Sequence, residues 1–268
     1  MKKNTRFAVL SILVFLILAV AFLADKIVPY DPLSASLSDA FQAPGKDHYF
    51  GTDALGRDVF SRVICGATTS VYSVLILVAV ILVVGTFLGI IAGYFGGVAD
   101  KIITAITNIA MAVPSLPLTV LLIAYLNPGK WSLIIAISIT AWTGTARILR
   151  ARVMQLKELP FIKIEKTMGV HPAVILFKHI LPNIKDIILT RGAMAISGAM
   201  MTEAGLSFLG LGEFGEKSWG SVLHYAFFRN SIMKKQYWWY VPPIVCICVC
   251  VLGFMLIGYY GKIKKGGE

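Results

Sequence analysis

Three long stretches without a charged residue constrain the fold of this chain more than any other feature. Residues 71–97, 102–126 and 236–261 contain no Asp, Glu, Lys or Arg. About 20 mostly apolar residues in a helix cross the hydrocarbon core of a bilayer. Backbone groups inside a bilayer must bond to one another, which favours helices in such stretches. Because charged residues make up only 15% of the chain, against about 25% in soluble domains, we expect an all-α integral membrane protein.

Six transmembrane helices are expected. Besides the three charge-free stretches, residues 7–24, 131–146 and 187–211 are apolar, although Arg191 and Glu203 interrupt the last of these. The basic residues that precede the first span are also typical of a secretory signal peptide. The length of that span favours an uncleaved helix, as does the bulky Phe22 at the −3 position of a cleavage after Ala24.

These spans divide the chain into four parts. The expected parts are an N-terminal transmembrane helix at 1–25, an extracytoplasmic segment at 26–70, a core of five spans at 71–261 and a tail at 262–268. Within the core, residues 157–183 are expected to form a two-helix loop between the fourth and fifth spans.

Basic residues predict the orientation of the spans, because cytoplasmic loops carry an excess of Lys and Arg. With the N-terminus in the cytoplasm, segment 147–191 and its nine Lys and Arg residues also lie there. The whole net charge of +11 then falls on the cytoplasmic side. We therefore expect a multi-pass protein of the cell membrane with both termini in the cytoplasm. Topology and contact with lipid explain the basic charge without a nucleic-acid partner.

Small and kinked positions within the spans predict close packing and a pathway. Gly85, Gly89 and Gly93 recur at every fourth residue, which lets a second helix approach closely; lining a pore is the alternative. Pro114 removes a backbone hydrogen bond from the third span. Glu203 is costly in a membrane unless it is paired or hydrated. Pro114 and Glu203 are candidates for a gate or pathway, with packing or capping of an outer turn as the alternative for Glu203.

No motif in the chain predicts catalysis. Residues 51–58, GTDALGRD, have the glycine spacing of a phosphate-binding loop. They carry Arg57 and Asp58 where that loop has Lys and Ser or Thr. The four cysteines lack the spacing of a zinc or redox site. We expect a chain that is not an enzyme and binds no metal or cofactor.

The loop between the fourth and fifth spans, FIKIEKTMGVHPAVILFKHILPN at 161–183, is basic and interrupted. Pro160 and Pro172 suit first helical turns, Gly169 separates two short helices, and Pro182 is expected to end the second. On a helical wheel, one face carries Phe161, Ile164 and Met168, and the opposite face carries Lys163, Lys166 and Thr167. Both a membrane-surface anchor and a docking site for a cytoplasmic partner fit this pattern.

The same loop carries a family resemblance. Gly169, eleven further residues and then Leu181-Pro182-Asn183 resemble the "EAA" loop of permease subunits of ABC importers. The stretches YDPLSASLSDAF, HYFGTDALGRDVFSRVICGATTS and TEAGLSFLGLG are similar to the dipeptide, oligopeptide and nickel branch of that family. Aligned on Gly169, the Glu of the family's Glu-Ala-Ala falls on Lys163, which reverses its charge.

The resemblance implies a type I ABC importer permease fold with a cytoplasmic coupling loop. It also implies a homologous second permease subunit, two ATPase subunits and an extracytoplasmic solute-binding protein, with ATP and Mg held by the partner subunits. The residues that it implies for coupling to the ATPase are Phe161, Lys163, Glu165, Lys166, Met168, Gly169, Val170 and Pro172.

The implied function is half of the translocation pathway of an ATP-driven importer. Peptide is the first expectation for the substrate, and nickel or a metal–chelator complex is the second. An ion-driven secondary transporter is the alternative from another class, although such proteins usually show repeats and intramembrane charge pairs.

Overall fold

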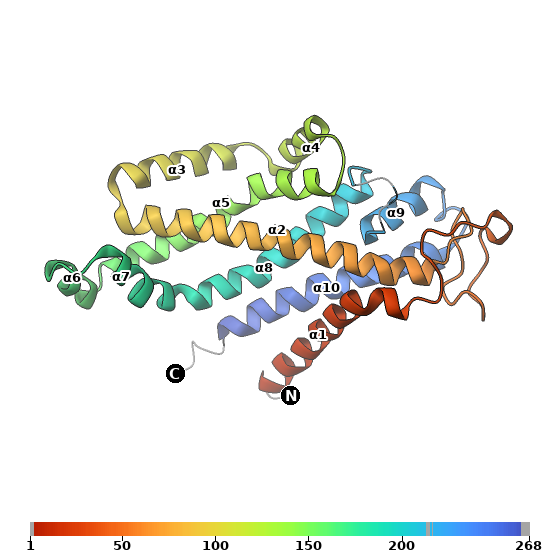
Figure 1. The fold of residues 1–268 in the computed structure, drawn as a ribbon, viewed down its shortest axis with the longest axis horizontal. Coiled ribbons are helices and arrows are strands. Elements are labelled where there is room, and N and C mark those ends of the chain that lie inside the picture. Colours follow the sequence, from red (N-terminus) through yellow and green to blue (C-terminus); the bar gives the residue numbers. More distant parts are fainter. Residues whose placement is uncertain (1–2, 213–214, 216, 264–268) are drawn as a thin grey trace.

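The computed structural model describes residues 3–212, 215 and 217–263, and the regular elements in them are helices (Figure 1). The helices are α1 (Lys3–Ile27), η1 (Leu37–Asp39), α2 (Val59–Phe95), α3 (Gly97–Ala112), α4 (Ser115–Leu126), α5 (Lys130–Lys157), α6 (Pro160–Thr167), α7 (Pro172–Ile175), η2 (Leu176–Ile180), α8 (Leu181–Phe208), α9 (Trp219–Phe228) and α10 (Tyr237–Ile263). The predicted tail at 262–268 lies outside the described residues from 264 onward.

Helix α2 is the centre of the bundle. It packs against α1, α5 and α8, and α10 lies beside both α8 and α1 (Figure 1). Val74, Leu77 and Ile81 of α2 are buried in the core that these helices share. The long apolar stretches of the sequence therefore pack on one another in the way that the span prediction requires.

Helix α2 begins at Val59 rather than at residue 71, so residues 59–70 of the predicted extracytoplasmic segment are helical. Its 37 residues extend about 55 Å, against a hydrocarbon core of about 30 Å. The Asp58 carboxylate caps the first turn by accepting a 2.7 Å hydrogen bond from the Ser61 N–H. Ser61 and Arg62 are buried in this extension. Because these residues are polar, the apolar stretch predicted from the sequence begins only after them.

The span predicted at 102–126 is broken rather than continuous. α3 and α4 meet at 90° across residues 113 and 114. Val113 has extended backbone angles (φ −87°, ψ 130°), which the following Pro114 favours over a helical conformation. The break turns α4 away from the axis of α3 and leaves a corner beside α5 (Figure 1).

The stretches expected as six spans lie on α1, α2, the α3–α4 pair, α5, α8 and α10, but α1 and α8 are not among the helices of the described residues that are long and apolar enough to cross a membrane. By length and composition, α2, α5 and α10 are apolar enough to cross a membrane, and α3 with α4 passes as one bent pair, when only the described residues are searched. Helix α1 contributes a shorter apolar stretch, Val14–Ala24. The sequence analysis did not predict helix α9. The Ser218 hydroxyl caps this helix by accepting a hydrogen bond from the Ser221 N–H.

The expectation that Pro182 ends a helix is wrong. α7, η2 and α8 follow one another without a gap, and Pro182 lies in the first turn of α8. A π turn precedes it, in which the Leu181 N–H bonds to the Leu176 carbonyl. The Asn183 side chain donates a 2.7 Å hydrogen bond to the His179 carbonyl. These bonds let the helix pass a proline that has no N–H to donate.

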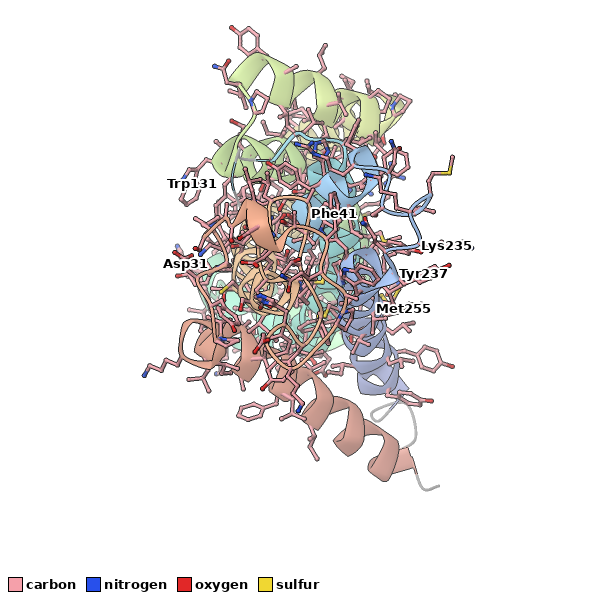
Figure 2. All side chains as sticks on the ribbon, turned by 90° about the vertical axis from the view of Figure 1, so that its right-hand side faces the viewer. Asp31, Phe41, Trp131, Lys235, Tyr237 and Met255 are labelled. Carbon is pink, nitrogen blue, oxygen red and sulfur yellow. The ribbon has the colours of Figure 1, made fainter. Side chains whose placement is uncertain are left out.

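Residues 28–58 form a cap over one end of the bundle, at the right of Figure 1. We call it the outer cap because the sequence predicts an extracytoplasmic segment here. Asp53 organises it: Oδ1 accepts from the Arg57 N–H at 3.0 Å, and Oδ2 lies 2.7 Å from Arg57 Nε. Gly56 has φ +71°, and an added Cβ there would lie 1.7 Å from the Ser36 carbonyl. GTDALGRD therefore builds a tight turn. Figure 2 looks onto this end, with Phe41 of the cap between Trp131 and Tyr237, which stand at the starts of α5 and α10.

Candidate functional site

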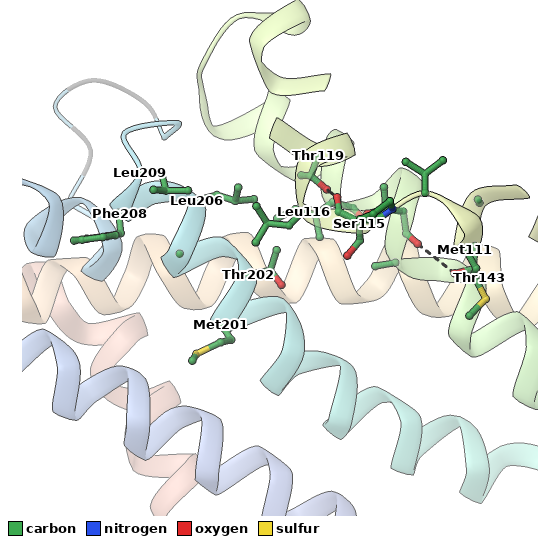
Figure 3. A pocket seen from close by; sticks show the side chains of 17 residues that line it. Met111, Ser115, Leu116, Thr119, Thr143, Met201, Thr202, Leu206, Phe208 and Leu209 are labelled. Atoms are coloured by element: carbon green, nitrogen blue, oxygen red, sulfur yellow. Dashed lines mark hydrogen bonds between the residues drawn. The ribbon is translucent and has the colours of Figure 1, made fainter. Parts of the chain in front are cut away.

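A cavity of about 750 Å³ lies between the α3–α4 break, α5 and α8 (Figure 3). Its apolar wall includes Met111, Leu116, Ile137, Met201, Leu206 and Phe208. Its hydroxyl groups come from Ser115, Thr119, Thr140, Thr143 and Thr202. None of the 17 described residues that line it is charged. A volume of this size is within the range of small-molecule sites, roughly 300–1,000 Å³.

The threonine hydroxyls of the cavity use their protons within their own helices. Thr119 Oγ1 donates to the Ser115 carbonyl at 2.7 Å, and Thr202 Oγ1 donates to the Gly198 carbonyl at 3.0 Å. Thr140 and Thr143 bond in the same way within α5. A hydroxyl that has donated its proton still has oxygen lone pairs that can accept. The cavity therefore offers acceptors on an apolar wall to the N–H groups of a solute.

The two gate or pathway candidates lie in different places. Pro114 lines the large cavity at the break between α3 and α4. Glu203 does not: it is buried, accepts a 2.9 Å hydrogen bond from the Ser207 hydroxyl, and faces a small gap that Ser73 and Lys130 also line. Glu203 thus belongs to the packed junction of α2, α5 and α8, beside the cavity.

The glycine stripe of α2 lies against α5. A Cβ added at Gly85 would lie 2.8 Å from Thr145 Cβ, and one at Gly89 would lie 2.8 Å from the Ala146 carbonyl oxygen. At Gly93 it would lie 2.8 Å from the Arg150 carbonyl oxygen. Since real Cβ contacts are almost never this short, the two backbones approach closely only because these positions are glycine. The stripe is a helix contact, away from the cavity.

A second candidate site is the loop that connects α5 to α8, at the opposite end of the bundle from the outer cap (Figure 1). Five apolar side chains of α6, of the residue that follows it, of α7 and of η2 are exposed, and we call them the docking face. They are Phe161 (43% exposed), Ile164 (59%), Met168 (76%), Val174 (45%) and Phe177 (70%). Exposed apolar side chains on a short loop are candidates for an interaction site. Phe177 also lines a groove with Val83 and Phe87 of α2.

The docking face rests on a buried apolar base. Ile162 of α6 and Ile175 of α7 point inward and are buried with Leu149 and Val153 of α5. These contacts join the loop to the long helix that also lines the cavity.

Side-chain contacts connect α6 with the segment that follows α7. His179 Nε2 of η2 lies 2.8 Å from Glu165 Oε1 of α6, and the His179 ring contacts Phe161 edge-on at 5.8 Å. Gly169 makes the turn with φ +79°, in the left-handed region that favours glycine. Val170 packs on the buried base, and Pro172 is the first residue of α7.

The two lysines of α6 are exposed, and one of them pairs with an acidic residue. Lys163 Nζ lies 2.9 Å from Glu158 Oε2, and more than half of each side chain is exposed. The hydrogen bond from Lys163 lowers the pKa of Glu158. Lys166 is exposed at the end of the helix. The cation at the position of the family's Glu thus has an acidic partner within its own chain.

The hydroxyl groups of the cavity were not predicted. Their sequence signal is a set of Ser and Thr spaced three or four residues apart inside otherwise apolar spans, as at Ser115 and Thr119. That signal is weak, because hydroxyls in membrane helices commonly bond to their own backbone. Only the fold shows that three separate helices, α4, α5 and α8, direct them to one cavity.

Comparisons with known proteins identify the family. Residues 85–261 match the family described as "Binding-protein-dependent transport system inner membrane component". The oligopeptide transport system permease protein OppC of Bacillus subtilis (strain 168) is 37% identical over 250 residues, which are 92% of this chain and 80% of that protein. The glutathione transport system permease protein GsiD of Pectobacterium atrosepticum is 34% identical, over 92% of this chain and 82% of its own. The dipeptide transport system permease protein DppC of B. subtilis is 33% identical, over 96% and 80%.

A solved structure shares the fold. A chain of the MetNI methionine ABC transporter, in an inward-facing form, superposes with a TM-score of 0.59 at 18% identity, covering 76% of this chain and 95% of that one. Identity at this level speaks for the fold alone, and it agrees with the helical arrangement described above. The chain belongs to the family of inner membrane components of binding-protein-dependent transport systems and has the type I permease fold of ABC importers.

Proposed function

We propose that this chain forms half of the translocation pathway of an ATP-driven peptide importer. The cavity between the α3–α4 break, α5 and α8 carries this proposal, because it combines an apolar wall with hydroxyl acceptors suited to the N–H groups of a peptide. The names of the three relatives, which refer to oligopeptides, glutathione and dipeptides, support the same substrate class. A homologous second permease would complete the wall.

The docking face supplies the coupling in this proposal. ATP binding and Mg belong to two separate ATPase subunits, and this chain binds neither. Closure of the ATPases would move the docking face and, through Ile162 and Ile175, the cavity-lining helix α5. Such a movement shifts the population between inward-facing and outward-facing states.

The outer cap and the orientation complete the proposal. With both termini in the cytoplasm, the docking face is cytoplasmic and the cap of residues 28–58 faces outward, where a solute-binding protein would meet it. The nine basic residues of 147–191 support this direction.

Reconstitution tests the proposed function. The chain, its partner permease, both ATPases and the binding protein are placed in proteoliposomes, and uptake of labelled tripeptide is compared with uptake of nickel. We expect peptide uptake that requires ATP and stops with vanadate. Nickel uptake without peptide uptake would support the metal alternative, and uptake driven by an ion gradient without ATP would contradict the proposal.

A further inference from the structure

Arg191 of α8 lies beside α5, next to the residues that line the cavity. A Cβ added at Gly144 of α5 would lie 3.4 Å from Arg191 Nη2. Thr143, which is adjacent to Gly144, lines the cavity, and so does Thr140 one turn away. The guanidinium is therefore within about one helical turn of the cavity wall, on the side toward the docking face.

The phase of α8 also points Arg191 toward the pathway. Thr202 and Gly205 of α8 line the cavity. These two residues follow Arg191 by 11 and 14 positions. At 3.6 residues per turn, each of them lies within about 40° of Arg191 around the helix axis. Arg191 thus lies on the face of α8 that forms the cavity wall further along the helix.

Two other arginines nearby have partners, which sets Arg191 apart. Arg150 Nη2 donates a 2.7 Å hydrogen bond to Asp100 of α3. Arg147 Nη2 donates a 3.0 Å hydrogen bond to Asn108 of α3. By contrast, Arg191 Nε is buried and has no hydrogen-bond partner in the part of the chain that the structure describes. One nitrogen of the half-buried Arg191 guanidinium thus lacks an acceptor among the described residues. Ionisable residues packed among membrane helices commonly mark a substrate path.

The cavity itself has no charge to meet the charged ends of a peptide. Its described lining is apolar or carries hydroxyls, and its threonines have donated their protons to their own helices. A carboxylate in the cavity would find few donors there. The guanidinium of Arg191 offers a planar set of donors that fits a carboxylate in a bidentate arrangement.

We propose that Arg191 is an anion subsite at the inner end of the cavity and receives the C-terminal carboxylate of the transported peptide. This inference rests on the proposed function. It adds a direction to transport: the peptide leaves the cavity with its carboxyl end leading toward the cytoplasm. Its amide N–H groups are then left facing the hydroxyl oxygens of Thr119 and Thr202.

The test compares trialanine, trialanine amide and N-acetyl-trialanine in the complete reconstituted complex. The affinity of the binding protein for each peptide is measured separately, and the binding protein is saturated with each before uptake and stimulated ATPase activity are recorded. The variants are Arg191→Gln and Arg191→Lys. Lys185→Gln is the matched control, since it removes one positive charge from an exposed position of the same helix.

In the unchanged complex we expect kcat/KM for trialanine to exceed that for its amide by about tenfold, as for the loss of a hydrogen bond to a charged group. N-acetylation should leave the rate unchanged. Arg191→Gln should abolish the preference for the free carboxylate by slowing trialanine alone, Arg191→Lys should retain part of it, and Lys185→Gln should retain all of it.

Other outcomes overturn the inference and identify the reason. An unchanged preference in Arg191→Gln, or no preference in the unchanged complex, shows that Arg191 does not receive the carboxylate. An equal loss for all three peptides with a lower yield of complex assigns Arg191 to a contact with the second permease. Failure of the unchanged complex to take up any peptide would instead count against the proposed function.

Discussion

At the scale of single residues, close contacts decide which positions tolerate change. Gly85, Gly89 and Gly93 bring α2 against α5 because no side chain stands between their backbones. The repeat in the sequence indicated a close contact, but it could not identify the partner helix. That information depends on the fold, which places α5 beside α2 along much of its length.

Gly89→Ala should destabilise the subunit by about 1–3 kcal/mol, the usual cost of overpacking a core. The added Cβ would lie 2.8 Å from the Ala146 carbonyl oxygen and 3.0 Å from Leu149 Cβ, and both belong to packed structure. The check is the midpoint of thermal unfolding in detergent.

Gly198→Ala is the matched control for Gly89→Ala. Gly198 is also inside a helix, but a Cβ there has no neighbour within 4 Å in this chain. Alanine should therefore stabilise α8 slightly through its helix propensity. Equal effects of the two substitutions on the isolated subunit would contradict the assignment of the stripe to helix packing.

Lys163→Glu should weaken binding of the ATPase while leaving the subunit folded. The substitution places a second acid beside Glu158, at the edge of the docking face. Lys185→Glu reverses a charge at another exposed position and serves as the control. Co-purification of the ATPase measures the difference, and equal retention by the two variants would show that Lys163 only faces water.

The Lys163–Glu158 pair itself should add little stability, because both side chains are mostly exposed. Lys163 lowers the pKa of Glu158 in the folded state. The small contribution of the pair is therefore present above the ordinary Glu pKa of 4.5 and is lost as the pH falls through the lowered folded-state pKa. Unfolding midpoints of Glu158→Gln and the unchanged chain should therefore differ only slightly between about pH 6 and 8.

At the scale of elements, the sequence predicted where helices exist better than where they end. The first turns of α2 contain polar residues such as Ser61 and Arg62, so they do not belong to an apolar run. Only the fold shows that these two residues are buried. Pro114 was expected to remove a hydrogen bond from one continuous span, whereas the structure shows a break with a 90° turn beside the cavity. Pro182 was predicted to end a helix, but a π turn and the Asn183 side chain accommodate it within a continuous helix.

Gly169→Val should uncouple ATP hydrolysis from uptake, whereas Gly169→Asn should retain most coupling. Gly169 has φ +79° and open space around a Cβ, so backbone conformation rather than crowding decides the effect. Left-handed backbone costs most residues about 1–2 kcal/mol, and Asn tolerates it better than a β-branched residue does. The strain in Gly169→Val would be relieved by a changed angle between α6 and α7.

The readouts for Gly169 are ATPase co-purification and the ratio of substrate-stimulated hydrolysis to uptake in nanodiscs and proteoliposomes. Glu165→Gln weakens the contact with His179 and provides an independent way to loosen the same angle. Full coupled transport by Gly169→Val would show that the loop does not transmit the motion. An equal loss of coupling in Gly169→Asn would show that any side chain at this position disturbs coupling, whatever the backbone angle φ.

At the scale of the whole molecule, the two candidate sites lie toward opposite ends of one set of helices. α5 lines the cavity with Ile137 and Thr143 and supports the docking face with Leu149 and Val153. Separate stretches of sequence predicted the docking surface and the spans. The packing that links them through α5 could not be predicted, because it depends on which helices become neighbours.

The final prediction concerns the orientation of the whole molecule. Single cysteines at Lys46 in the outer cap and at Lys166 on α6 replace exposed side chains at opposite ends of the bundle. In a background without the native cysteines, a membrane-impermeant maleimide should label position 46 in intact cells and position 166 only after lysis. The physical reason is the excess of Lys and Arg in segment 147–191, which favours retention on the cytoplasmic side. Lys157→Cys, on the last turn of α5, should behave like Lys166→Cys. Labelling at 166 and 157 in intact cells, with protection at 46, would invert the topology, place the docking face beyond the reach of any ATPase and remove the basis for coupling.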